Sequence, residues 1–177
     1  FRSVRPYFVK RLCFYGPEST GKSTMTIRLA EKFNTEYVPE VARELITSND
    51  FTLDDIIRTG KAQTQRVIEK TKTANKILFC DTDLITTQIY SRYYLGEVPD
   101  LLFELERQVM YHQYFLFGID VPWVEDGLRD LGEQRERMLN TFSEELTKRN
   151  IVPIPVNGPF EQREELLAKY VESLLDD

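Results

Sequence analysis

GPESTGKS, residues 16–23, is the stretch that decides the fold, because it is a complete G-x-x-x-x-G-K-[ST] loop. An apolar, strand-like run ends just before it at Tyr15, and a helical pattern begins at Lys22. The glycines allow the backbone to curl around a phosphate, so that its N–H groups point inward at the start of the helix. The stretch therefore predicts a phosphate-binding loop, or P-loop, rather than a glycine-rich turn that happens to contain lysine.

The side chains of this loop match a nucleoside triphosphate. The Lys22 ammonium is expected to reach the β- and γ-phosphate oxygens, and the Ser23 hydroxyl is expected to bind Mg²⁺. ATP and Mg²⁺ are therefore the expected cofactors. The residues expected to contact ATP in this loop are Gly16, Glu18, Ser19, Thr20, Gly21, Lys22, Ser23 and Thr24.

Strand-like and helical patterns alternate along the rest of the chain. The strand-like runs are residues 9–15, 35–38, 76–80, 114–119 and 151–156. The helical patterns are residues 22–33, 53–73, 84–94, 133–149 and 161–175. Several strand runs (LCFY, ILFC and YFLF) are continuously apolar, which is typical of parallel strands covered on both faces. The alternation predicts an α/β fold: a three-layer P-loop NTPase of the nucleoside/nucleotide-kinase kind, with a five-stranded parallel sheet and a helical lid.

The length and composition are those of one ordinary globular domain. The 177 residues can bury a substantial core, and hydrophobic residues make up 41% of them. The net charge of −6, without any block of Lys and Arg, argues against a nucleic-acid partner. No apolar run approaches the roughly 20 residues needed to cross a bilayer. The two cysteines, Cys13 and Cys80, lie in apolar strand-like runs and are expected to be free thiols, so a cytoplasmic location is expected. We expect residues 1–8 to be a linker from a preceding domain and residues 9–177 to form the P-loop domain.

Two acids follow the third strand-like run, in the string Cys80-Asp81-Thr82-Asp83. An acid at the tip of an apolar strand beside a P-loop can hold Mg²⁺ directly or through water. The carboxyl ends of parallel strands form the ligand crevice of an open α/β sheet, so both acids are well placed. Asp81 is the candidate metal ligand. Asp83 is a candidate site residue, with capping of the following helix as the alternative.

A second acidic element follows the second strand-like run. Glu40 and Arg43 stand three residues apart at the start of a predicted helix and therefore share one face. Glu40 is a candidate to accept the proton of an attacking hydroxyl, and Arg43 is a candidate to bind substrate or phosphate. A surface ion pair is the alternative for both residues.

An arginine-rich stretch, residues 120–137, contains two glycines and has the features of a closing lid. A lid excludes water and brings guanidinium groups to the phosphoryl group being transferred. Arg129, followed by Arg135 or Arg137, is expected to offset the developing charge. An ordinary charged, solvated helix explains the same composition.

Three further side chains are candidates for ligand contacts. Trp123, the only Trp of the sequence, either anchors the core or a hinge or stacks on a ligand ring. Tyr94 follows Asp83 on the same predicted helix and either packs on the core or lines the substrate pocket. Asn157 follows the fifth strand-like run, where an adenine could rest near the P-loop, although a plain turn explains it equally well.

Other classes of P-loop protein fit the sequence less well. A GTPase needs an N-K-x-D guanine reader, and the string NKIL at residues 75–78 lacks the Asp. The sequence also has no D-x-x-G switch motif. An AAA-type ATPase usually has a further helical lid domain, for which this sequence is too short. A small-molecule kinase is therefore the favoured class.

The strings GPESTGKST, VPEVARE, FCDTDLITTQIY and WVEDGLRDLG make a family resemblance specific. In this order and at these spacings they resemble the ribosylnicotinamide kinase domain of NadR-like proteins, over residues 9–175. The resemblance implies ATP-dependent phosphorylation of nicotinamide riboside to nicotinamide mononucleotide, a salvage step toward NAD. In that family the kinase follows a nicotinamide mononucleotide adenylyltransferase domain, so the resemblance also implies one half of a bifunctional protein.

The resemblance implies roles for several of these residues. Asp81 would serve the metal, while Glu40 and Asp83 would sit at the ribose with Arg43 nearby. Glu40 is the first candidate for the base that accepts the 5′-hydroxyl proton, and Asp83 is the second. Pro39 stands where family members can have an aromatic residue, so Tyr94 or Trp123 becomes a candidate to contact the pyridinium ring, with Tyr37 as a substitute.

Two other functions stay open at this point. One is a regulatory module that senses ATP or NAD by binding it without turnover. The other is a kinase for another nucleoside-like small molecule, which the same residues would permit. ATP and nicotinamide riboside are the expected partners, without nucleic acid or membrane, and the oligomeric state is left open.

Overall fold

The sheet is parallel, as expected, in the computed structural model, which describes residues 8–46, 48, 50–120 and 131–176. Within those residues five strands pair in the order β2-β3-β1-β4-β5, and every pairing is parallel. The strands are β1 (Lys10–Tyr15), β2 (Tyr37–Val38), β3 (Ile77–Asp81), β4 (Gln113–Phe117) and β5 (Ile154–Val156). The P-loop strand β1 is therefore central, and the carboxyl ends of all strands meet at one edge of the sheet.

Five of the helices lie close to the predicted segments, the short α2 begins two residues after Glu40 near the expected helix start, and one helix was not predicted. They are α1 (Lys22–Lys32), α2 (Ala42–Leu45), α3 (Leu53–Thr73), α4 (Leu84–Leu95), α5 (Asp100–Gln108), α6 (Leu131–Lys148) and α7 (Phe160–Leu175). Helix α5 was not predicted. It buries Leu102 and Leu105 against α3 at Gly60, where a Cβ would come within 2.5 Å of the Leu102 side chain. None of the helices in the described part of the chain is long and apolar enough to cross a membrane.

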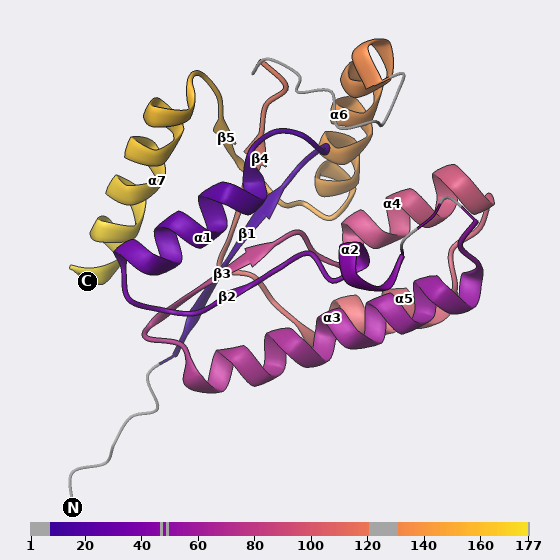
Figure 1. The fold of residues 1–177 in the computed structure, drawn as a ribbon, viewed down its shortest axis with the longest axis horizontal. Helices are drawn as coiled ribbons and strands as arrows, with labels where there is room; N and C mark the ends of the chain where they lie inside the picture. The colour runs from indigo at the N-terminus through magenta and orange to yellow at the C-terminus, as the bar shows by residue number, and fades with distance from the viewer. Residues whose placement is uncertain (1–7, 47, 49, 121–130, 177) are drawn as a thin grey trace, which may run out of the picture.

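Side chains of β1 point alternately to the two faces of the sheet, and helices cover each face, which gives three layers (Figure 1). Leu12 and Phe14 point into a core shared with α1 and α7, which lie on the left of the sheet in Figure 1. Cys13 and Tyr15 point to the opposite side, into a core shared with α4 and α6. Because both faces of β1 are covered, its side chains from Leu12 to Tyr15 are fully buried, and this explains their continuous apolar run. The predicted three-layer α/β fold is confirmed.

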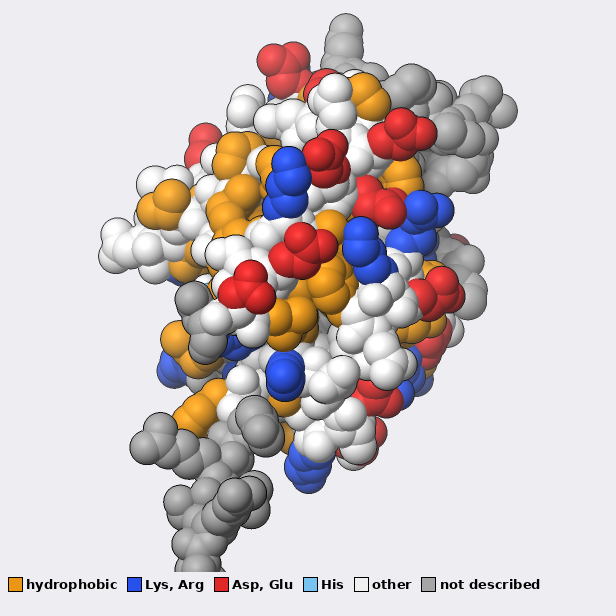
Figure 2. All heavy atoms as spheres, turned by 90° about the vertical axis from the view of Figure 1, so that its left-hand side faces the viewer, with side chains coloured by type: hydrophobic (Ala, Val, Ile, Leu, Met, Phe, Trp, Pro, Cys, Tyr) orange, Lys and Arg blue, Asp and Glu red, His pale blue; other side chains and the backbone are white. Residues whose placement is uncertain are grey.

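The outer surface over α1 and α7 carries side chains of both charges. Figure 2, which looks onto that side of the molecule, shows red and blue side chains interspersed with apolar ones. One pair across the two helices joins the Arg28 Nε to the Glu164 carboxylate at 2.7 Å. This pair joins α1 to α7 at the surface of the molecule.

The P-loop leaves β1 pressed against the end of β4. Gly16 has a φ of 133°, and a Cβ there would lie 2.9 Å from the Phe117 carbonyl oxygen. A side chain would therefore meet both backbone strain and a backbone atom. The glycine lets the chain turn out of β1 while β4 stays in register, and this places the loop directly above the centre of the sheet.

Candidate active site

Lys22 is buried inside the loop that it belongs to. Its side chain is 5% exposed, and its Nζ donates to the Pro17 carbonyl oxygen at 2.5 Å and to the Thr20 Oγ1 at 3.2 Å. Burial lowers the pKa of the Lys22 ammonium, while the charges of Asp81 and Glu40 act to raise it. The cation thus lies within electrostatic reach of both acids, which come from the ends of two other strands.

Ser23 and Asp81 form a pair that fits a divalent cation. The Ser23 Oγ donates to the Asp81 Oδ2 at 2.6 Å. Asp81 is 2% exposed, and among the described residues its Oδ1 has no hydrogen-bond partner. A hydroxyl and a carboxylate oxygen are ligands that Mg²⁺ prefers, and Mg²⁺ commonly takes few protein ligands together with waters and phosphate oxygens. A buried carboxylate oxygen without a partner is costly, and a bound cation would remove that cost.

Glu40 is the buried acid at the end of β2. Its side chain is 7% exposed and accepts a hydrogen bond from the Arg43 Nε at 3.0 Å. Burial, followed by repulsion from Asp81, raises the pKa of Glu40 to about 7, against the attraction of Lys22 and Arg43. Val41, which follows Glu40, is held against α3, because its N–H donates to the Gln63 Oε1 at 3.1 Å. A carboxylate that titrates near neutrality suits proton acceptance from a hydroxyl.

Asp83 is held differently. It is the N-cap of α4, and its Oδ1 accepts from the Thr86 N–H at 3.0 Å and the Thr86 Oγ1 at 3.1 Å. Its Oδ2 accepts from the Tyr114 hydroxyl at 2.7 Å. Burial raises the pKa of Asp83, and these donors oppose the rise. The capping role considered from the sequence is therefore present, and both carboxylate oxygens already have partners.

The backbone turns sharply between the two acids. Thr82 has a φ of 71°, in the left-handed region that β-branched residues rarely adopt. Its N–H donates to the Phe14 carbonyl oxygen at 2.9 Å, which ties the turn to β1. Asp81 reaches Ser23 in α1, whereas Asp83 reaches Tyr114 in β4. The two neighbouring acids thus serve different parts of the site.

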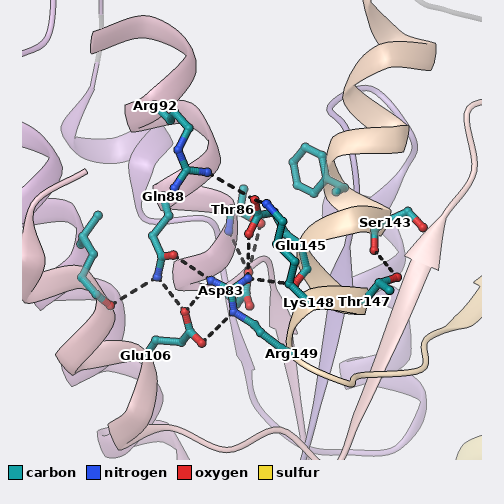
Figure 3. Close-up of polar contacts among 12 residues, drawn as sticks. Asp83, Thr86, Gln88, Arg92, Glu106, Ser143, Glu145, Thr147, Lys148 and Arg149 are labelled. Atoms are coloured by element: carbon teal, nitrogen blue, oxygen red, sulfur yellow. Dashed lines mark hydrogen bonds and ion pairs between the residues drawn. The ribbon is translucent and has the colours of Figure 1, made fainter. Parts of the chain in front are cut away.

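A charged network fastens the helices next to Asp83 (Figure 3). Arg149, directly after α6, donates to Glu106 of α5 at 2.9 Å, to Gln88 of α4 at 2.9 Å and to the Glu145 carboxylate at 2.8 Å. Arg92 of α4 adds a bond to Glu145 at 3.3 Å. The end of α6 is therefore held against α4 and α5, the same helices that follow Asp83 in the chain.

The near end of α6 reaches the P-loop. Arg135 is 6% exposed, and its Nη2 donates to the Ser19 carbonyl oxygen at 3.3 Å. Its Nε has no partner among the described residues, and burial lowers the pKa of its guanidinium. Arg135 thus lies beside the loop, as a charge-offsetting arginine should, whereas Arg137 is exposed. Arg129 and Trp123, the other predicted lid residues, lie outside the described residues.

The aromatic residues of α4 lie at different depths. Tyr94 is 50% exposed and packs edge-on against Phe51, with their ring centroids 5.5 Å apart. Tyr90 packs on Phe142 at 6.1 Å, and burial together with the charges of Glu18 and Glu40 raises its pKa. The Tyr90 hydroxyl is therefore within electrostatic reach of Glu18 and Glu40. Of the two, Tyr90 is the more closely coupled to the site acids.

Arg163 was missed by the sequence analysis. It lies in the first turn of α7, is 1% exposed, and donates hydrogen bonds to several loops at the carboxyl edge of the sheet. The predicted ATP contact Asn157 is exposed, and its Oδ1 occupies the place of a Cβ at Gly118. A signal for Arg163 existed, because it stands four and eight residues before Leu167 and Val171 on the apolar stripe of α7.

The sequence matches a known family and its relatives. A family model described as "AAA domain" matches residues 11–163. The trifunctional NAD biosynthesis/regulator protein NadR of Escherichia coli is 33% identical over 156 residues, which cover 84% of this chain and 38% of that protein. The protein of the same name from Salmonella typhimurium is 34% identical over 158 residues, again 84% and 38%. The chain thus spans less than half the length of these curated relatives.

Solved structures show the same fold. A NadR protein in complex with NAD and AMP-PNP matches with a TM-score of 0.77 at 22% identity, over 94% of this chain and 49% of that one. A NadR protein in complex with NR has a TM-score of 0.76 at 24% identity, over 93% and 51%. A deoxyadenosine kinase from M. mycoides has a TM-score of 0.64 at 16% identity, over 92% and 99%. Although the family description contains the term AAA, these folds are those of P-loop kinases and of NadR.

Proposed function

This chain belongs to the AAA domain family whose model matches residues 11–163, as a nucleoside/nucleotide-kinase-like domain related to NadR, and we propose that it phosphorylates nicotinamide riboside with ATP. The product would be nicotinamide mononucleotide. One observation carries the proposal: Lys22, the Ser23–Asp81 pair and the buried Glu40 meet at one edge of the sheet. The relatives named NadR supply the choice of acceptor, since one of them is a solved complex with NR.

The chemical step needs one proton acceptor and several positive charges. The ribose 5′-hydroxyl oxygen would form a bond to the γ-phosphorus, while the bond from that phosphorus to the β–γ bridging oxygen breaks and ADP leaves. Glu40 would take the hydroxyl proton, for which its pKa of about 7 is suited. Lys22 and Arg135 would offset charge on the phosphoryl oxygens. Asp83, with both oxygens engaged, is better suited to hold α4 in position beside the ribose.

Ser23 and Asp81 are the residues that would hold Mg²⁺. They fit this ion because the orphaned Asp81 Oδ1 is buried beside the Ser23 hydroxyl. When bound, Mg²⁺ supplies positive charge to the β- and γ-phosphates. The protein's part is to fix those two oxygens next to Lys22, and the P-loop does this by placing Lys22 and Ser23 side by side at the start of α1.

A panel of acceptors tests the proposal. ATP consumption should be measured with nicotinamide riboside and with other nucleosides, in the wild type and in Lys22→Ala. We expect the highest kcat/KM with nicotinamide riboside and a loss of about three orders of magnitude or more in Lys22→Ala, since the main phosphate cation is gone. The matched control is Lys61→Ala, an exposed lysine on α3, which should leave turnover unchanged.

Each other outcome has a definite meaning. Full activity in Lys22→Ala would rule out phosphoryl transfer by this loop. A clear preference for another nucleoside would favour the second candidate, a different nucleoside kinase, which the fold shared with deoxyadenosine kinase supports. ATP binding without turnover on any acceptor would favour the nucleotide-sensing module.

A further inference from the structure

One buried guanidinium joins the loops at the carboxyl edge of the sheet. The Arg163 Nε donates to the Gly158 carbonyl oxygen at 2.7 Å, after β5. Its Nη1 donates to the Thr20 carbonyl oxygen of the P-loop at 3.3 Å. Its Nη2 donates to the Gly118 carbonyl oxygen at 3.1 Å and to the Asp120 Oδ1 at 2.6 Å, after β4. A single side chain thus connects the loops that follow β1, β4 and β5.

The position does not need a charge for packing alone. Arg163 lies on the apolar stripe of α7, where its neighbours four and eight residues on are Leu167 and Val171. Burial lowers the pKa of its guanidinium, and Asp120 opposes the fall. Burying a charge in this way is costly and is offset only by good hydrogen bonds. Here the guanidinium donates to three backbone carbonyl oxygens at loop ends and to the Asp120 carboxylate.

The loops after β4 and β5 form one corner. The Gly158 N–H donates to the Asp120 Oδ2 at 2.7 Å, so Asp120 links the two loops directly. The Asn157 side chain fills the space above Gly118, where no Cβ would fit. We call residues 118–120 and 157–158 the β4–β5 corner. Arg163 is the residue that ties this corner to the P-loop.

The corner lies across the central strand β1 from the acids of the site. The acids Asp81 and Glu40 follow β3 and β2, on one side of the central strand β1. The β4–β5 corner lies on the other side of β1. A nucleotide whose triphosphate lies on the P-loop, with its γ-phosphate turned toward Glu40, must extend its base away from the acids. In the proposed ATP complex the base would therefore extend toward the corner.

We propose that Arg163 is a positioning residue for the nucleotide, which holds the β4–β5 corner and the P-loop at a constant separation so that base and triphosphate bind as one unit. The inference rests on the ATP site of the proposed function but not on the choice of acceptor. Because the residue acts through the loops, its effect falls on nucleotide affinity rather than on the chemical step. A ligand that lacks the base and sugar does not use the corner and should be affected much less.

Two ligands separate this role from a merely structural one. The affinities of AMP-PNP and of inorganic tripolyphosphate, each with Mg²⁺, should be measured by calorimetric titration. In Arg163→Met we expect AMP-PNP affinity to fall at least about tenfold, and tripolyphosphate affinity to fall at most about threefold. The matched control is Arg28→Met on the outer side of α1, whose exposed pair with Glu164 of α7 should leave both affinities unchanged.

A milder variant covers the case in which Arg163→Met fails to fold. Asp120→Ala removes the link from the corner to both Arg163 and the Gly158 N–H at a side chain that is 50% exposed. It should weaken AMP-PNP by about threefold to tenfold, with tripolyphosphate unchanged. An equal loss for both ligands, or no loss for either, in the variants that fold would overturn the proposal. Intact AMP-PNP binding without phosphorylation of nicotinamide riboside would instead contradict only the choice of acceptor in the proposed function.

Discussion

The ends of β2 and β3 each present a buried acid to the same edge of the sheet, yet the two acids are held in opposite ways. Asp83 has a hydrogen-bond donor on each carboxylate oxygen, from Tyr114 and from Thr86. Glu40 has the Arg43 Nε, whose side chain is 58% exposed. The difference teaches that burial alone does not identify a catalytic acid. Burial raises the pKa of both acids, so their hydrogen-bond donors distinguish them: the fully engaged Asp83 suits a supporting role, and Glu40 is the better candidate for proton transfer.

The largest expected effect is on turnover in Glu40→Gln. The amide keeps the size of the side chain but cannot accept the hydroxyl proton, so we expect kcat to fall by about 10²–10⁴-fold. Steady-state kinetics with saturating ATP measures it. Glu44→Gln, an exposed glutamate four residues on that pairs with Arg66, is the matched control and should change kcat little. If Glu40→Gln turned over normally while Asp83→Asn did not, the roles of the two acids would be reversed.

The next effect concerns stability and has the opposite sign. The pKa of Glu40 is raised to about 7 in the folded protein, so the folded state holds a proton that the unfolded chain has already lost. Its contribution to stability is fully present below the ordinary glutamate pKa and is lost as pH rises through 7. Glu40→Gln should therefore be more stable than the wild type at pH 8, by on the order of 3 kcal/mol at most, and similar at pH 4. Urea unfolding at both pH values measures the difference in the free energy of unfolding between the variant and the wild type. Equal stability at pH 8 would contradict the raised pKa.

The smallest effect tests the support of Asp83. Tyr114→Phe removes the donor to the Asp83 Oδ2 and should destabilise the fold by about 1–2 kcal/mol. The loss should grow with pH, because the pKa of Asp83 rises further without this donor and its ionised form is then the less stable one. Tyr93→Phe is the control, since the Tyr93 hydroxyl donates to Gln134 at an exposed position. A loss of kcat without a loss of stability in Tyr114→Phe would show that Asp83 takes part in the chemical step.

Local patterns in the sequence predict the part of the site that is local in the chain. The strand–loop–helix at Lys22 and the acids at the ends of β2 and β3 follow from residue type, apolar runs and the geometry of parallel sheets. Helix α5 was missed because it is only nine residues long, although its apolar residues gather on one face. Its packing against α3 and α4 stabilises it in the folded protein.

Partners that are distant in sequence could not be predicted. Nothing near Asp83 indicates that Tyr114 will donate to it, because that bond requires β4 to lie next to β1. The bonds of Arg149 to α4 and α5, and those of Arg163 to three loops, depend in the same way on the assembled fold. A charge on an apolar stripe, as at Arg163, marks a position for inspection but does not name its partners.

The central place of β1 has a consequence for the order in which the protein folds. β1 pairs with β3 through Lys10 and Ile77 and with β4 through Leu12 and Gln113, so both of its neighbours come from far along the chain. Contacts of this kind form slowly, because long loops must close first. The P-loop is the most local motif of the sequence, yet its final shape depends on the end of β4 beneath Gly16 and on Arg163 of α7. The P-loop residues are therefore synthesised well before the elements that shape the loop, and the proposed nucleotide binding would report the completion of folding.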